Sequence, residues 1–153
     1  QMCIRDRCRV TQLEKSGVPV GIGVDGSASN DNSNIMKEVR QAFLLQRLHN
    51  GSQVTHLTAL SWATEGGANV LRRPEIGRIK PGMQSDLALF KLDELRFSGY
   101  GDPLAALVIC GAERADYVMV AGKWLVIDGQ IPGLNLSELK NQHHKAAINI
   151  QTM

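Results

Sequence analysis

Apolar residues recur at helical spacing in the first half of the chain. Over residues 35–48 they occupy every third or fourth position, which predicts an amphipathic helix. A second helix is predicted to end near residue 71, and Thr55 or Thr58 can cap its first turn. The glycine pair inside it, Gly66-Gly67, predicts close packing against a neighbouring segment.

An apolar run without polar alternation, VPVGIGVD, occupies residues 18–25. Such a run is typical of a strand that is covered on both faces in a parallel sheet. It ends on Asp25, and nine small or polar residues, GSASNDNSN, come before the next helix. Several side chains over 30–34 can cap that helix.

The second half of the chain favours short strands. One is predicted over about 86–90, and a hairpin comes later in which Ala121-Gly122-Lys123 separate two β-rich runs. Between them, Asp102 can cap a short helix that begins with proline. A polar helix from about Ser137 closes the chain, so the predicted order is β-α-α, a small β-rich unit and a helix.

Composition restricts the classes of protein that fit. The chain has 153 residues, of which 43% are hydrophobic and 21% charged, as in an ordinary globular domain. Its net charge of +2, with no stripe of basic residues, argues against a nucleic-acid partner. No apolar run approaches the roughly 20 residues of a membrane-spanning helix, so no membrane association is expected.

Three cysteines, Cys3, Cys8 and Cys110, form an odd set without metal-type spacing. Reduced thiols in a cytoplasmic protein are the expected state. Cys110 lies in an apolar run and is predicted to be buried in the core. Trp62 and Trp124 are predicted to be packing anchors.

Residues 2–7, near the start of the chain, have neither helical nor strand periodicity. MCIRDR, at residues 2–7, resembles the translated adapter sequence found at the ends of some reading frames. Residues 1–9 are therefore expected to be a non-native scar. The natural sequence is expected to begin near Arg9 or Val10, inside a longer protein.

Several interpretations of Asp25 compete. It can be a turn or cap residue, as most Asp-Gly aspartates are. A calcium loop fails on spacing, because Met36 stands at the twelfth position where a bidentate glutamate is needed. A phosphate-binding loop fails because Gly21 and Gly23 precede the carboxylate and no G-x-x-x-x-G-K-[ST] run exists. The remaining interpretation is a carboxylate at the C-terminal end of a barrel strand, where the chemistry of such barrels is located.

Four stretches of the sequence carry a resemblance to a known family. GVDGSASNDNSN resembles the segment around the eighth strand of the amidohydrolase superfamily. The resemblance is greatest to the branch that deaminates guanine-like and triazine rings, and it narrows toward the members that act on 8-oxoguanine. The other three stretches are ATEGGANVLRRPEIGRIKPGMQSDLALF (63–90), DPLAALVIC (102–110) and VMVAGKWLVIDGQ (118–130).

This resemblance implies an α/β fold that forms the C-terminal part of a (β/α)8 TIM-like barrel with part of a small composite β domain. Residues 10–75 would be the end of the catalytic barrel and 76–133 the small β-rich domain. Residues 134–153 would form a C-terminal helix.

The resemblance also implies a role for Asp25. In the family, the matching aspartate contacts one catalytic divalent metal ion, usually zinc, and moves a proton. Ser27 is a candidate substrate contact, with a plain turn residue as the alternative. The family's other metal ligands are histidines, including an H-x-H pair. None of the four histidines here forms such a pair, so all four are expected to be structural or solvated: His49, His56, His143 and His144.

The implied function is hydrolytic deamination of a guanine-like purine, 8-oxoguanine, to the oxo product and ammonia. The implied binding partner is a small-molecule substrate. The full-length protein is expected to be a homo-oligomer. The chain by itself is expected to be inactive, because it carries one catalytic residue of several. A guanine or hydroxytriazine aminohydrolase and a non-catalytic binding or assembly module remain as alternatives.

Overall fold

The structure is a computed structural model, and it describes residues 8–152. The prediction of a non-native start therefore falls mostly outside the described residues. Within 8–152, six helices, a π-helical turn and three strands make up the regular structure: α1 Val10–Lys15, α2 Ile35–Asn50, α3 His56–Ser61, the π-turn Trp62–Gly66, α4 Gly67–Leu71, β1 Leu87–Leu89, α5 Pro103–Ile109, β2 Tyr117–Val120, β3 Lys123–Val126 and α6 Leu136–Gln151. Short 3₁₀ turns lie at Gly51–Gln53 and Leu95–Phe97.

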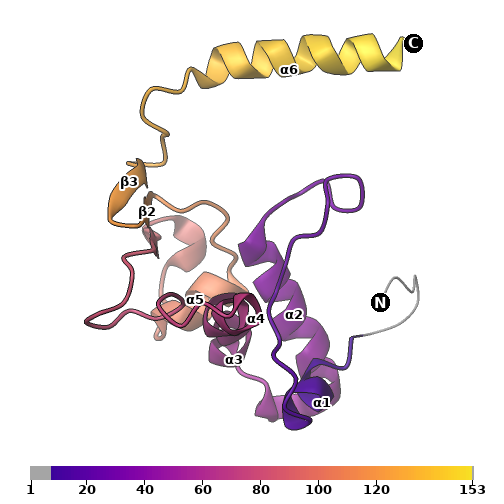
Figure 1. Cartoon of the computed structure of the whole chain (residues 1–153), viewed down its shortest axis with the longest axis vertical. Helices are drawn as coiled ribbons and strands as arrows, with labels where there is room; N and C mark the ends of the chain where they lie inside the picture. The colour runs from indigo at the N-terminus through magenta and orange to yellow at the C-terminus, as the bar shows by residue number, and fades with distance from the viewer. Residues whose placement is uncertain (1–7, 153) are drawn as a thin grey trace.

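Helices α1, α2, α3 and α5 contribute to the larger of two apolar clusters among the described residues. Helices α2, α3 and α5 contact one another, and Figure 1 shows them side by side in the lower part of the molecule. Their shared core is a cluster of seven buried residues: Val10, Val39, Phe43, Val54, Ala59, Trp62 and Val108. Val39 and Phe43 anchor α2 in this core, which matters because α2 begins directly after the loop that carries Asp25.

The predicted helix starts are confirmed by their caps. Asn34 caps α2, because its side-chain oxygen accepts the backbone N–H groups of Met36 and Lys37. Thr55 rather than Thr58 caps α3, and the two threonines form a capping box. The predicted second helix continues to Leu71, with a π-helical turn in its middle.

The strand expected over 18–25 is not formed among the described residues. The only sheet there is β1-β2-β3, so this apolar segment has no neighbouring strand to complete a ladder. The segment instead lies against the π-turn, where the Ile22 N–H donates to the Trp62 carbonyl at 3.3 Å. A β ladder needs a partner strand, and sequence pattern alone does not supply one.

Gly66 confirms the predicted close packing of the glycine pair. A Cβ atom on Gly66 would lie 2.2 Å from the backbone oxygen of Val20, which is far inside van der Waals contact. A Cβ on Gly67, in contrast, would meet nothing within 4 Å. Both glycines have ordinary right-handed helical dihedrals, so the two positions differ only in the room available for a Cβ atom.

Gly66→Ala is expected to lower the free energy of unfolding by about 1–3 kcal/mol, because the segment around Val20 must move away. Gly67→Ala is the matched control and is expected to raise stability by roughly 0.5–1 kcal/mol, since alanine is the better helix former. Urea denaturation of the 153-residue chain measures both. Equal effects of the two substitutions would show that the contact with Val20 is absent.

The three strands form a small antiparallel sheet. Leu87 pairs with Met119, and the β2–β3 hairpin turns at Ala121-Gly122, both of which have positive φ (49° and 77°). The Asp86 carboxylate accepts the Ala121 N–H at 2.7 Å and so holds this turn. That hydrogen bond, together with one from Gln84, lowers the pKa of Asp86 below its ordinary value of 3.8.

Helix α6 lies apart from the rest of the molecule. None of its residues is buried, and Figure 1 shows it beyond the sheet at the end of an extended connection. In the part of the chain that the structure describes, no helix combines the length and apolarity needed to span a membrane.

Candidate active site

Asp25 stands where the apolar segment ends and the loop to α2 begins. Its backbone is left-handed, with φ of 62°, a conformation that aspartate tolerates better than most residues. One carboxylate oxygen, Oδ1, accepts the N–H of Gly26 at 2.7 Å. The residue is exposed, and Oδ2 has no hydrogen-bond partner among residues 8–152. The described residues thus orient the carboxylate through one oxygen and leave the other without a partner from this part of the chain.

Ser27 lies in the tight turn that comes next. The Gly26 carbonyl accepts the N–H groups of Ser29 and Asn30 at 2.9 and 3.0 Å, and this closes the turn. Ser27 is exposed, and its hydroxyl makes no hydrogen bond to the described residues. Asp25 therefore directly precedes the exposed turn that contains Ser27, and the role of Ser27 stays a prediction.

Asn30 fastens the middle of the loop to α2. Its amide nitrogen donates to Glu38 Oε1 at 2.7 Å, and its amide oxygen accepts the Asn32 N–H at 3.0 Å. Sequence pattern predicted a capping role for this region but did not single out Glu38. Acidic residues are common in the first turn of a helix, so Glu38 carries no distinctive signal.

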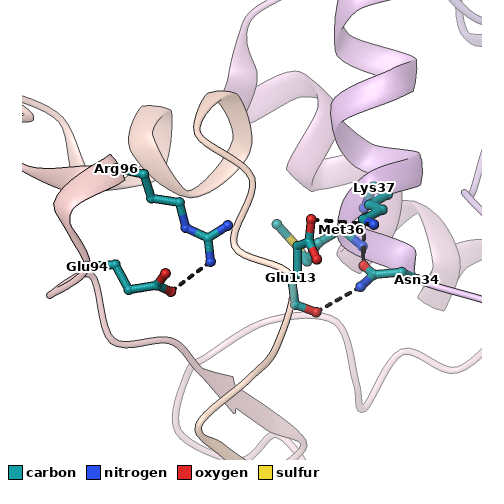
Figure 2. Close-up of polar contacts among 6 residues, drawn as sticks. All are labelled: Asn34, Met36, Lys37, Glu94, Arg96 and Glu113. Atoms are coloured by element: carbon teal, nitrogen blue, oxygen red, sulfur yellow. Dashed lines mark hydrogen bonds and ion pairs between the residues drawn. The ribbon is translucent and has the colours of Figure 1, made fainter. Parts of the chain in front are cut away.

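The end of the loop is fastened to a distant segment, as Figure 2 shows. The Asn34 side chain donates to the backbone oxygen of Glu113 at 2.8 Å, while the Glu113 carboxylate pairs with Lys37 at 3.4 Å. Glu94 and Arg96 form a separate ion pair nearby, at 2.7 Å. The segment that contains Glu113 leads into β2, so these contacts connect the loop to the small sheet.

A polar cavity of about 340 Å³ adjoins this region. At its edge the Asp128 carboxylate accepts hydrogen bonds from the Tyr117 hydroxyl and from Lys91 Nζ. The Tyr117 bond, followed by that from Lys91, lowers the pKa of Asp128, and the same two bonds raise the pKa values of Tyr117 and Lys91. The three groups are paired with one another, so this cluster ties the end of the sheet together.

His56 has a structural partner. Its Nε2 atom lies 3.1 Å from Asp102 Oδ2, and Asp102 also caps α5 by accepting the N–H groups of Leu104 and Ala105. The Ala105 hydrogen bond is the largest cause of a lowered Asp102 pKa, and the Leu104 hydrogen bond lowers it further. This pair joins the starts of α3 and α5, which fits the structural role expected for the histidines.

Residues 4–125 match the amidohydrolase family. The chain belongs to this family. It is 57% identical over 92% of its length to 8-oxoguanine deaminase from Pseudomonas aeruginosa, of which it covers 31%. It is also 32% identical over 86% of its length to isoxanthopterin deaminase from an unknown prokaryotic organism, again covering 31% of the relative.

A solved amidohydrolase-fold structure has the same arrangement. The crystal structure of an adenosine deaminase from Xanthomonas campestris with bound zinc superimposes with a TM-score of 0.87 at 28% identity. The match covers 95% of this chain and 34% of that one. The chain thus spans about a third of the length of the family members that it matches.

The described residues do not by themselves make a zinc site. They contain no group of three or more His, Cys, Asp or Glu side chains that could hold a metal ion. A catalytic zinc ion usually takes about three protein ligands. Asp25 fits as one oxygen donor, since the residue is exposed and residues 8–152 offer no hydrogen-bond partner to its Oδ2 atom.

Proposed function

We propose that this chain is the C-terminal part of a metal-dependent aminohydrolase that deaminates 8-oxoguanine. The observation that carries the proposal is the 57% identity to 8-oxoguanine deaminase over 92% of the chain. The reaction replaces a ring amino group by oxygen: water attacks the C–N carbon, the C–N bond breaks, and ammonia leaves. The full-length enzyme is the protein of which this chain forms about a third.

Asp25 is the group proposed to move the proton. Water must lose a proton as its oxygen bonds to the ring carbon, and the departing nitrogen must gain one. A carboxylate with an unpartnered oxygen can accept the first proton and donate it in the second step. When bound, a zinc ion would supply the acidification of water that makes attack possible at neutral pH.

The proposed placement of the chain within the enzyme follows the family. Residues 10–75 would close the catalytic barrel, with 18–25 as a strand once its neighbours are present, and 76–133 would form part of the small β domain. The TM-score of 0.87 to a zinc-containing amidohydrolase supports this placement. We expect the full-length enzyme to be a cytoplasmic homo-oligomer with a small-molecule substrate.

Activity on a panel of ring amines tests the proposal. Purified full-length enzyme is expected to release ammonia from 8-oxoguanine with a kcat/KM at least roughly tenfold above that for guanine, isoxanthopterin or a hydroxytriazine, a margin typical of pocket contacts. It is also expected to retain stoichiometric zinc through dialysis. A higher kcat/KM for one of the other rings would reassign the substrate within the family. Absence of both deamination and bound zinc would favour the non-catalytic module.

A further inference from the structure

The loop from Asp25 to Asn34 is held in a conformation that its own residues do not favour. Asp25 and Ser33, near its two ends, both have left-handed backbones, with φ of 62° and 43°. L-residues adopt this region uncommonly, because Cβ crowds the following carbonyl. A loop with two such residues needs contacts outside itself to keep one conformation.

Contacts from side chains of the loop reach other elements at two points. Asn34 binds the backbone of Glu113, and this contact also involves the cap of α2. Asn30 binds Glu38 at 2.7 Å, in a half-buried position. Of the two contacts, the Asn30–Glu38 bond lies closer to Asp25 along the chain.

The orientation of the Asn30 amide is determined from both ends. Its oxygen must face the N–H of Asn32, and its nitrogen must face the Glu38 carboxylate. Glu38 in turn precedes Val39, which is fully buried in the helical core. The chain of contacts therefore runs from a helix anchored in the core, through Glu38 and Asn30, into the turn that contains Ser27 and directly follows Asp25.

We infer that Asn30 and Glu38 are positioning residues for Asp25. This inference rests on the proposed function of Asp25 as the proton-transferring group. The Asn30–Glu38 bond fixes the turn closed by the Gly26 carbonyl, and that turn fixes the carboxylate through the Gly26 N–H. Neither positioning residue touches the reacting atoms.

The test exchanges donor and acceptor across this bond in the full-length enzyme. Glu38→Gln keeps an oxygen that accepts from Asn30, so kcat on 8-oxoguanine is expected to stay within about threefold of wild type, as for a retained hydrogen bond. Asn30→Asp places two carboxylates face to face, and kcat is expected to fall roughly 10- to 100-fold, since small displacements of a catalytic group cost this much. The double variant, Asn30→Asp with Glu38→Gln, restores the bond with its direction reversed, because the new amide on α2 can donate to the new carboxylate in the loop. It is expected to recover most of the lost kcat.

Glu113→Ala is the matched control. It removes an exposed carboxylate that pairs with Lys37 on α2, but it keeps the backbone oxygen that binds Asn34. Its kcat and KM are expected to match wild type. KM is expected to change less than kcat in Asn30→Asp, because the displaced group acts in the chemical step.

Hydrogen exchange of the loop amides gives a readout that is independent of activity. Residues 26–33 are expected to exchange faster in Asn30→Asp and at the wild-type rate in the double variant. Unchanged exchange in Asn30→Asp would overturn the inference, whether or not the wild-type enzyme deaminates 8-oxoguanine. Failure of the wild-type enzyme to deaminate 8-oxoguanine would instead count against the proposed function. Faster exchange with wild-type kcat would also overturn the inference, because the bond would then hold the loop without positioning Asp25.

Discussion

Asp25→Asn is expected to lower kcat of the full-length enzyme by about 10²–10⁴-fold, the usual contribution of general acid–base catalysis. Asparagine keeps the shape of the side chain, and its amide oxygen can still accept the Gly26 N–H. It also tolerates the left-handed backbone at this position, where φ is 62°. What it loses is the ability to accept a proton, and its neutral amide is also a weaker metal ligand than the carboxylate, so a loss of kcat is assigned to proton transfer only where bound zinc is retained. Steady-state kinetics on 8-oxoguanine measures the effect.

Ser27→Ala is the control, in the turn that directly follows Asp25. Its hydroxyl makes no hydrogen bond within the described residues, so its loss leaves the turn intact. If this hydroxyl contacts the substrate, the expected cost is about tenfold in kcat/KM, equivalent to one ordinary hydrogen bond. Bound zinc and the far-UV circular dichroism spectrum are recorded for both variants. A kcat within a few-fold of wild type for a folded Asp25→Asn enzyme would leave Asp25 as a turn residue only.

The helices were predictable because their signals are local. The apolar spacing over 35–48 and the cap at Asn34 both lie within a few residues of the helix that they specify. The strand over 18–25 could not be confirmed in the same way, because a strand exists only with a partner. Its apolar character is nevertheless consistent with its position against the π-turn, where Gly66 leaves room for Val20.

Burial was harder to predict than secondary structure. Trp62 is a packing anchor as expected, but Trp124 is 46% exposed on the sheet, with Tyr117 against its ring. The prediction that Cys110 is buried is wrong: it is exposed although it ends an apolar run, because it lies just past the end of α5. An apolar residue is buried only when another element covers it, and the sequence does not say which elements meet.

The contacts that hold the candidate site illustrate the same limit. Asp25 is a candidate because of a family resemblance that extends over most of the chain. The bond between Asn34 and the Glu113 carbonyl joins residues 79 positions apart, and no local pattern marks either of them as a partner. Glu38 similarly has the features of an ordinary first-turn acid of a helix. A candidate residue for the chemistry is therefore easier to predict from the sequence than the distant contacts that hold its loop.

Trp62 gives the largest expected effect on stability. It is 2% exposed within the helical core, and its carbonyl accepts the N–H of Ile22, which joins the apolar segment to the helices. Trp62→Ala is expected to lower the free energy of unfolding by about 3–5 kcal/mol, through lost burial and the cavity that remains. Urea denaturation of the 153-residue chain is the measurement, with resistance to limited proteolysis as the second readout if the variant has no native baseline.

Trp124→Ala removes the same side chain from an exposed position and is the matched control. Trp124 is 46% exposed, so its removal is expected to lower the free energy of unfolding by less than about 1 kcal/mol, apart from the loss of its ring contact with Tyr117. Trp62→Phe separates packing from hydrogen bonding, because it keeps most of the buried ring but removes the N–H that donates to Glu14 at 2.6 Å. Losing this hydrogen bond is expected to lower the free energy of unfolding by about 1 kcal/mol, and the smaller ring lowers it by a smaller amount through lost packing. Similar losses for Trp62→Ala and Trp124→Ala would contradict the placement of Trp62 in the helical core, because only one of these rings lies inside it.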